Sequence, residues 1–229
     1  MQQDKLDEFR TECAVMEIIR HPNIVMFLGA CTKPPELCII LEYCGRGSLW
    51  SCLHDKNIKL SWEFRKKIAL DIAKGVLYLH TMNPPILHRD LKSLNVVLDH
   101  ACNAKLADFG WTRIKAKKMT AKIGTYQWMA PEVIASFKYS EKADVFSYGI
   151  ILWELATRKP PYYGVDGTEV SQKVVKEDLR PTLSRDEEAS IPSSFNELMR
   201  DCWARNPVER PHFDEIISRL ESMNFKGIN

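Results

Sequence analysis

A run of twelve mostly apolar residues, VFSYGIILWELA (145–156), most constrains how this chain can fold. A transmembrane helix needs at least about 18 apolar residues, so the run is too short to span a bilayer, and a charged turn follows it. We therefore predict a helix in the core of a globular domain, and no membrane span in the chain.

The composition is that of a soluble globular protein. Hydrophobic residues make up 45% and charged residues 27% of the 229 positions, which is ordinary for a globular chain that can bury a proper core. The net charge is +2, from 32 basic and 30 acidic residues, and this balance gives no support for nucleic-acid binding. The first residues, MQQDKLDEF, are polar and charged, unlike a secretory signal.

The cysteines form no recognisable framework. No CxxC pair occurs, and no group of His and Cys has the spacing of a zinc site. We expect free thiols in a reducing, cytoplasmic compartment. The cysteines are Cys13, Cys31, Cys38, Cys44, Cys52, Cys102 and Cys202.

The apolar pattern predicts small strands among more numerous helices. Leu6, Phe9, Cys13 and Met16 lie on one face of a helix over 5–20, which the sequence HPN ends. An antiparallel pair and a flexible connector are expected next. The other predicted segments are strands at 24–30 and 37–43, a connector at 44–48, a helix at 62–80, strands at 95–99 and 104–108, a loop at 109–130, and helices near 143–157, 168–177, 194–203 and 211–222.

Three motifs occur in a fixed order: HRDLKSLN (88–95), DFG (108–110) and MAPE (129–132). Each is a common accident alone, but the three in this order are specific. From residue 5 onward the chain resembles a protein kinase. The resemblance implies an α+β, two-lobed kinase-like fold. Its parts would be a partial small lobe at 1–43, a hinge connector at 44–48 and a large, mainly helical lobe at 49–229.

The resemblance implies roles for the polar residues of these motifs. Asp90 would orient the acceptor hydroxyl of a protein substrate and accept its proton, and Lys92 would carry positive charge toward the γ-phosphate of ATP. Asn95 and Asp108 would be oxygen ligands of Mg²⁺. The alternative, a polar surface loop followed by an acidic turn, would have to arise independently at each motif.

The same resemblance implies an adenine site beside the connector. Leu41 would lie at the back of the pocket, just before the hinge. Backbone groups of Glu42 and Cys44 would bond adenine, and Val97 would pack beneath the ring.

Residues near the DFG sequence are expected to regulate activity. Arg89 resembles the docking point for a phosphate on the activation segment, and Thr120 is the hypothesised phosphosite. Thr120 as an ordinary solvated loop residue stays an open alternative. Thr125 would bond Asp90 and Lys92 and help define the acceptor pocket.

Other matches concern the scaffold. Glu132 would pair with Arg210, and Asp144 would fasten the catalytic loop from below. Met16, Phe27, His88 and Phe109 match a stack of apolar side chains that links the lobes. A plain role in the hydrophobic core explains Met16 and Phe27 equally well.

Two features favour Ser/Thr over Tyr substrates: Lys92, and Gly-Thr in GTYQWMAPE (124–132). Segments such as DCWARNPVERP and HPNIVMFLGACTKPPELCIILEY resemble the tyrosine-kinase-like branch, which includes Raf-like and mixed-lineage Ser/Thr kinases. Dual specificity and strict Tyr specificity stay open.

One part of the kinase pattern is missing from the sequence. No GxGxxG loop and no VAIK-type lysine occur, although Glu12 matches the helix glutamate that such a lysine pairs with. Lys5, on the same helix, could not replace it. Three interpretations stay open: an active kinase whose N-terminal segment is absent here, a pseudokinase-like scaffold, or a weakly active kinase completed by another chain. An upstream kinase is a further possible partner.

Overall fold

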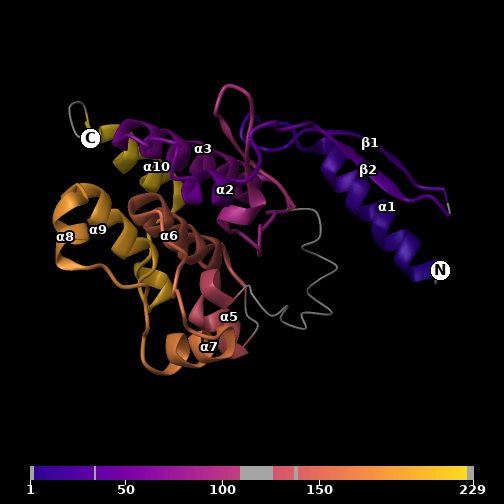
Figure 1. Ribbon diagram of the computed structural model, residues 1–229. Coiled ribbons are helices and arrows are strands. Elements are labelled where there is room, and N and C mark those ends of the chain that lie inside the picture. The colour runs from indigo at the N-terminus through magenta and orange to yellow at the C-terminus, as the bar shows by residue number, and fades with distance from the viewer. Residues whose placement is uncertain (1–2, 34, 109–125, 137–138, 226–229) are drawn as a thin grey trace.

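The computed structural model describes residues 3–33, 35–108, 126–136 and 139–225, without the side chains of residues 3–5, 8 and 12. Its fold is α+β, as expected, with helices and two small antiparallel sheets (Figure 1). The helices are α1 (Gln3–Ile18), α2 (Leu49–His54), α3 (Trp62–Thr81), α5 (Pro131–Ser136), α6 (Glu141–Thr157), α7 (Gly167–Lys176), α8 (Arg185–Ser190), α9 (Ser193–Cys202) and α10 (Phe213–Ser222). The strands are β1 (Phe27–Cys31), β2 (Cys38–Leu41), β3 (Val96–Leu98) and β4 (Ala104–Leu106), and the 3-10 turns are η1 (Ser93–Asn95), η2 (Tyr126–Trp128) and η3 (Pro207–Glu209).

Helix α6 is the centre of the hydrophobic core, which confirms the prediction from the apolar run. Nearly every residue from Ala143 to Leu155 is buried. Helices α3 and α9 pack against it, and Gly149 lets α9 approach closely, because a Cβ there would lie 3.1 Å from Cβ atoms of Cys202 and Trp203. In the part of the chain that the structure describes, no helix is long and apolar enough to cross a membrane.

Helix α3 is the longest in the core and matches its predicted position closely. Ser61 caps its first turn by accepting a hydrogen bond from Phe64 N at 3.3 Å. Its buried face carries Ile68, Ile72 and Leu79 at helical spacing, and α10 packs against it.

The N-terminal elements lie to one side of the helical body (Figure 1). Strands β1 and β2 form the predicted antiparallel pair, and α1 packs against β1. Of the predicted apolar face of α1, Leu6, Cys13 and Met16 are buried and Phe9 is half-buried.

Two stretches of backbone join this part to the second sheet. Val25 N donates to Leu106 O, and Leu106 N donates to Asn23 O, at 2.9 Å each. On the other side, the connector pairs with β3, because Arg46 N donates to Leu98 O at 3.1 Å and Ser48 bridges Val97. The flexible connector expected from the sequence is therefore hydrogen-bonded to a strand.

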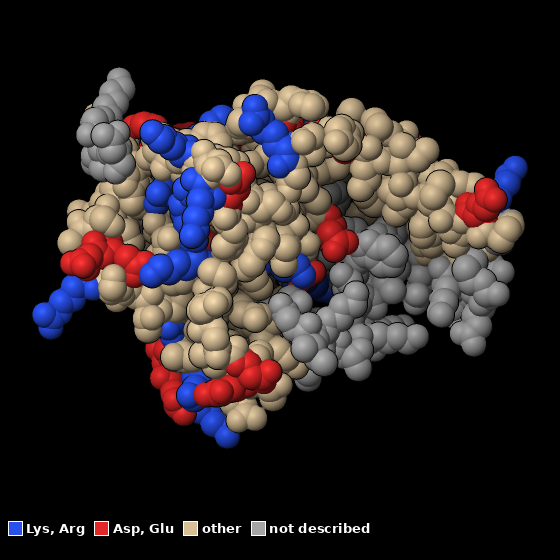
Figure 2. Space-filling model, in the orientation of Figure 1, with Lys and Arg blue, Asp and Glu red and all other residues tan. Residues whose placement is uncertain are grey.

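Two short helices were not predicted, namely α5 and α8, each of six residues. All seven cysteines are free. On the face shown in Figure 2, basic and acidic side chains alternate and do not gather into one basic surface.

Candidate active site

The loop that carries the HRD sequence is held from below by one buried carboxylate of α6. Asp144 is 1% exposed, and its two oxygens accept the backbone N–H groups of His88 and Arg89 at 2.9 Å each. Its Oδ2 also lies 2.8 Å from Nε2 of His80. Burial alone raises the pKa of Asp144, but hydrogen bonds, that to His80 foremost, bring the pKa below its ordinary value. The expected fastening role of Asp144 matches this geometry.

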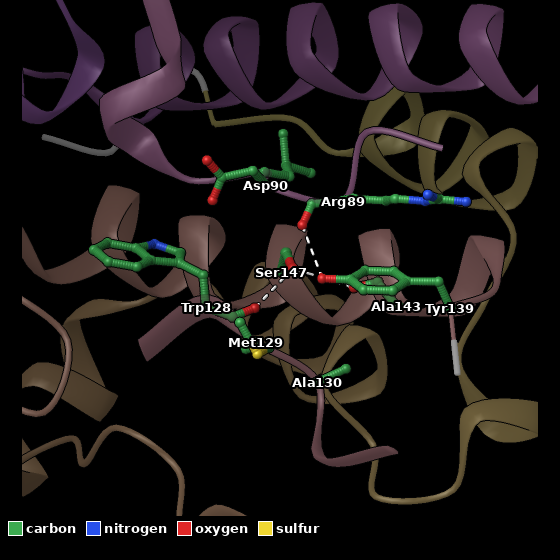
Figure 3. A pocket seen from close by; sticks show the side chains of 9 residues that line it. Arg89, Asp90, Trp128, Met129, Ala130, Tyr139, Ala143 and Ser147 are labelled. Carbon is green, nitrogen blue, oxygen red and sulfur yellow. Dashed lines mark hydrogen bonds between the residues drawn. The ribbon is translucent and has the colours of Figure 1, made fainter. Parts of the chain in front are cut away.

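The backbone of the loop is strained at Arg89, whose φ is 65°. A non-glycine residue in this region costs about 1 kcal/mol or more, so surrounding contacts must hold it. Besides the bond from Arg89 N to Asp144, the Tyr139 hydroxyl donates to Arg89 O at 2.9 Å, and the Arg89 guanidinium lies over the Tyr139 ring at 5.6 Å. Figure 3 shows the side chains of Arg89 and Asp90 leaving the loop in opposite directions.

Asp90 is the centre of a small polar network. Lys92 Nζ lies 3.1 and 3.0 Å from its two carboxylate oxygens, and Asn95 Nδ2 donates to Oδ2 at 3.0 Å and to the backbone oxygen of Asp90 at 2.8 Å. The side chains of Asp90 and Lys92 are 18% and 15% exposed. The network fixes the carboxylate, and the side chain of Asp90 keeps partial access to solvent.

Backbone pairing brings Asp108 next to this network. The carbonyl oxygen of Asn95 accepts the N–H of Ala107 at 2.8 Å, so Asp108 is one residue away from the loop. Asp108 has a φ of 59°, in the same left-handed region as Arg89. The structure therefore brings the side chains of Asp90, Lys92 and Asn95 into contact and places the backbone of Asp108 beside this loop.

A second buried carboxylate of α6, Glu154, joins the loop to the segment after the undescribed residues. Ser93 Oγ donates to Glu154 Oε1 at 2.7 Å, and Trp128 Nε1 donates to Oε2 at 2.8 Å. Burial raises the pKa of Glu154 to about 8, and the two hydrogen bonds oppose this shift. The sequence does not single out Glu154, although a Glu inside an apolar run signals a buried carboxyl that needs partners.

A cleft lies between the loop and the residues of the MAPE motif, where Figure 3 shows its lining. Met129 and Ala130 border it on one side, and Asp90 on the other. Ser147 of α6 donates to Trp128 O at 2.7 Å, which fixes this wall to the core helix.

The residues expected around adenine lie beside the connector. Glu42 N donates to Met26 O at 2.9 Å, and its carboxylate forms an ion pair with Lys105 at 2.8 Å. Cys44 O accepts from Gly47 N at 3.3 Å, and burial raises the pKa of the Cys44 thiol. Val97 is half-buried in β3, which the connector borders, and Leu41 ends β2.

The expected structural pair is present. Arg210 is 1% exposed, and it donates from both terminal nitrogens to Glu132, at 2.7 and 2.9 Å. It also donates to the backbone oxygens of Ala204 and Lys142 at 2.8 Å each. A guanidinium hydrogen-bonded in this way joins α5 and the start of α6 to the segment between η3 and α10.

Several predictions concern residues outside the description. Phe109, Thr120 and Thr125 lie in the undescribed range 109–125, and only the helical backbone of Glu12 is described. Of the stack proposed with Phe109, Met16 and His88 are buried and Phe27 is half-buried. These predictions therefore stay predictions.

Together, a loop anchored on a buried central helix, an Asp–Lys–Asn network and an adjacent Asp after a short hairpin define the protein-kinase fold. A family model described as "Protein tyrosine and serine/threonine kinase" matches residues 1–220. The chain belongs to this family, which confirms the resemblance predicted from its motifs.

Named relatives agree with this assignment. The "Probable serine/threonine-protein kinase drkA" of Dictyostelium discoideum is 45% identical over 223 residues, covering 97% of this chain and 34% of that protein. Serine/threonine-protein kinases STY46 and STY17 of Arabidopsis thaliana are 44% and 42% identical, over 94% and 96% of this chain and 37% and 38% of theirs. The chain thus spans about a third of the length of these relatives.

Proposed function

We propose that this chain acts as an ATP-dependent protein serine/threonine kinase, transferring a γ-phosphoryl group to a hydroxyl of a protein substrate. The observation that carries the proposal is the Asp90 carboxylate, held by Lys92 and Asn95 at 3.0 Å each beside a cleft. The preference for Ser and Thr rests on the names of the relatives and on Lys92.

The loop residues have distinct roles in this proposal. Asp90 orients the acceptor hydroxyl and takes its proton as the oxygen becomes a nucleophile. Lys92 places a positive charge beside that carboxylate, where phosphoryl transfer develops negative charge. Asp144 acts through the backbone, because it positions the loop without contacting the cleft.

The residues present fit a magnesium ion held together with nucleotide phosphates. In the described ranges no three His, Cys, Asp or Glu side chains gather as a metal cage. Mg²⁺ in phosphotransferases takes only one or two protein ligands besides phosphate oxygens and water. The side-chain nitrogen of Asn95 donates to Asp90, so the side-chain oxygen of Asn95 points away from that hydrogen bond. Asp108 directly follows Ala107, whose N–H donates to the backbone oxygen of Asn95. When bound, Mg·ATP supplies the phosphoryl group and neutralises its charge.

The adenine ring is proposed to lie against the connector. The Glu42 N–H is used by Met26 O and the Cys44 carbonyl by Gly47. This leaves the carbonyl of Glu42 and the N–H of Cys44 as the groups for adenine, with Val97 and Leu41 as its apolar contacts. In this proposal residues 1–43 form the small lobe, 44–48 the hinge and 49–229 the large lobe.

Regulation through residues 109–125 is part of the same proposal. Phosphate on Thr120 would dock on Arg89, Thr125 would border the acceptor pocket, and Glu12 and Phe109 would link helix α1 to the site. An upstream kinase would be the natural source of that phosphate.

The competing function is a scaffold that binds partners without catalysis. Incubation with Mg·ATP and a library of Ser-, Thr- and Tyr-containing peptides separates the two. A kinase labels Ser and Thr, and Asp90→Asn lowers the rate at least about a hundredfold, while the surface variant Asp186→Asn leaves it unchanged. Absence of labelling in all three proteins, despite a folded state, would favour the scaffold.

A further inference from the structure

Two cysteines face each other at the end of the first sheet. In the antiparallel pairing of β1 and β2, Cys31 is the register partner of Cys38, and the pairs Ala30–Ile39 and Gly29–Ile40 follow along the ladder. The cysteine pair is therefore the last pair of strand residues before the turn that joins the two strands.

The spacing of such a pair suits a disulfide. Residues directly opposite in an antiparallel sheet have Cα atoms about 4.5 to 5.5 Å apart, and their side chains leave the same face of the sheet. Cα atoms of disulfide-bonded cysteines are usually about 4.4 to 6.8 Å apart. A Cys31–Cys38 bond therefore needs no change of register and only a small approach of the two Cβ atoms.

Both thiols are free and reachable. Cys38 is exposed and Cys31 is half-buried, and Cys31 Sγ makes a weak contact of 3.9 Å with the oxygen of Lys33 in the turn. The thiolate of an exposed cysteine can attack an external disulfide. A cysteine opposite it on the neighbouring strand is then placed to attack the resulting mixed disulfide.

The remaining cysteines have different surroundings. Cys13, Cys52 and Cys202 are buried. Burial raises the pKa of Cys44, Cys52 and Cys202, which lowers the thiolate fraction on which exchange depends. The sheet thus places Cys31 and Cys38 opposite each other with Cys38 exposed, whereas Cys13, Cys52 and Cys202 are buried.

We propose that Cys31 and Cys38 are a reversible thiol–disulfide site whose oxidant is a low-molecular-weight disulfide such as oxidised glutathione. The Cys38 thiolate attacks one sulfur of the oxidant, forming a mixed disulfide and releasing one thiolate. Cys31 then gives its proton to solvent and attacks the Cys38 sulfur, which forms the protein disulfide and releases the second thiolate. Two protein thiols are oxidised and one disulfide is reduced to two thiols.

The bond would act on a part of the fold that has little support of its own. A two-stranded hairpin is marginally stable, and Leu28 and Ile40 of this one are 56% and 54% exposed. A covalent link at its end restricts separation of the strands. Intracellular disulfides are typically transient and redox-sensing, which agrees with free thiols in the resting state. This inference does not depend on the proposed kinase activity.

Mass spectrometry of the full chain can test the site. The protein is equilibrated with glutathione buffers of increasing oxidised fraction at ~1 mM total glutathione, then blocked with N-ethylmaleimide and cleaved with trypsin and a glutamate-specific protease. Cleavage after Glu36 and Glu42 separates Cys31, Cys38 and Cys44. The expected product is a linked pair of peptides containing Cys31 and Cys38, about tenfold more abundant than either mixed disulfide, since the partner thiol acts at high effective concentration.

The neighbouring Cys44 supplies an internal comparison, because it is closer to Cys38 in sequence than Cys31 is. Sequence proximity alone favours a Cys38–Cys44 link, and the fold favours Cys31–Cys38. In denaturant the preference for Cys31–Cys38 should disappear. Cys31→Ser should leave glutathione bound to Cys38, and Cys102→Ser should change nothing. Separate glutathionylation of Cys31 and Cys38 in the folded wild type, or a dominant link to another cysteine, would overturn the proposal.

Discussion

Arg210 donates two hydrogen bonds to the carboxylate of Glu132, which lies 78 positions earlier in the chain. The side chain of Arg210 is fully buried and that of Glu132 is 22% exposed, so water reaches the carboxylate but not the guanidinium. Removing one partner of such a pair leaves the other charge poorly solvated.

Arg210→Met is therefore expected to lower the free energy of unfolding by about 3 kcal/mol, and Arg210→Lys by less, since an ammonium keeps the charge and loses the two-pronged contact. Urea denaturation measures both. Arg200→Met is the matched control, because Arg200 pairs with Glu188 at 2.7 Å while both side chains are about half exposed. Its effect should stay below about 1 kcal/mol, and equal losses at the two sites would contradict the prediction.

Glu154 predicts how stability depends on pH. Its folded pKa of about 8 lies above the ordinary value of 4.5, so the folded state holds this proton more tightly than the unfolded chain does. The stabilisation is complete below about pH 4.5 and is lost as pH rises through 8. Glu154→Gln should remove this decline, which is on the order of a few kcal/mol, when urea midpoints are compared from pH 5 to 9.

The amide in Glu154→Gln can still serve both neighbours, accepting from Trp128 and donating to the hydroxyl of Ser93. The variant should therefore fold with η2 in place. The surface variant Glu197→Gln should keep the decline of the wild type. A decline that persists unchanged in Glu154→Gln would assign it to another group.

Replacing Gly75 by alanine has two opposing effects on the free energy of unfolding. Alanine in place of glycine inside α3 favours the helix by about 1 kcal/mol. Its Cβ, however, would lie 2.8 Å from the backbone oxygen of Asn23 and 2.9 Å from Leu106 Cδ1, and overpacking of this kind costs about 1–3 kcal/mol. Gly75→Ala should be net destabilising in thermal unfolding. Gly29→Ala, with nothing within 4 Å of the added Cβ, should not, and a stabilised Gly75→Ala protein would show that the backbones separate readily.

Asp144→Asn tests how the loop is held. The new amide group can point an oxygen at one backbone N–H of the loop only, and its NH₂ faces the other donor. A local loss of about 2 kcal/mol corresponds to roughly thirtyfold faster amide hydrogen exchange at His88 and Arg89. Amides of the last turn of α10 serve as the reference, and unchanged protection at both loop amides would refute the anchoring role.

The parts of the fold that could be predicted are those whose signal lies within one element. The apolar spacing of α3 and the uninterrupted run in α6 reveal helices because a helix repeats its burial pattern over several turns. Helices α5 and α8 have six residues each, too few for a pattern to repeat. In α8 the capping box of Ser184 and Glu187 was the available signal.

In the site, too, the residues that could be predicted are those that lie close together in the sequence. Asp90, Lys92 and Asn95 lie within six positions of one another, so their motif is visible in the sequence. The partners of Glu154 lie 61 and 26 positions away, and only the tertiary fold shows which donors meet it. The pairing of the connector with β3 was hidden for the same reason.

Both buried carboxylates that hold the loop belong to α6, with Asp144 in its first turn and Glu154 in its last. They are ten positions apart in the helix, a rise of about 15 Å, and the loop is tied at His88 near one end and Ser93 near the other. A single residue inserted between them would rotate one carboxylate by about 100° relative to the other and release one attachment. Substitutions between them leave this spacing intact, whereas a change of length does not, so insertions and deletions in this part of α6 should be tolerated less well than substitutions.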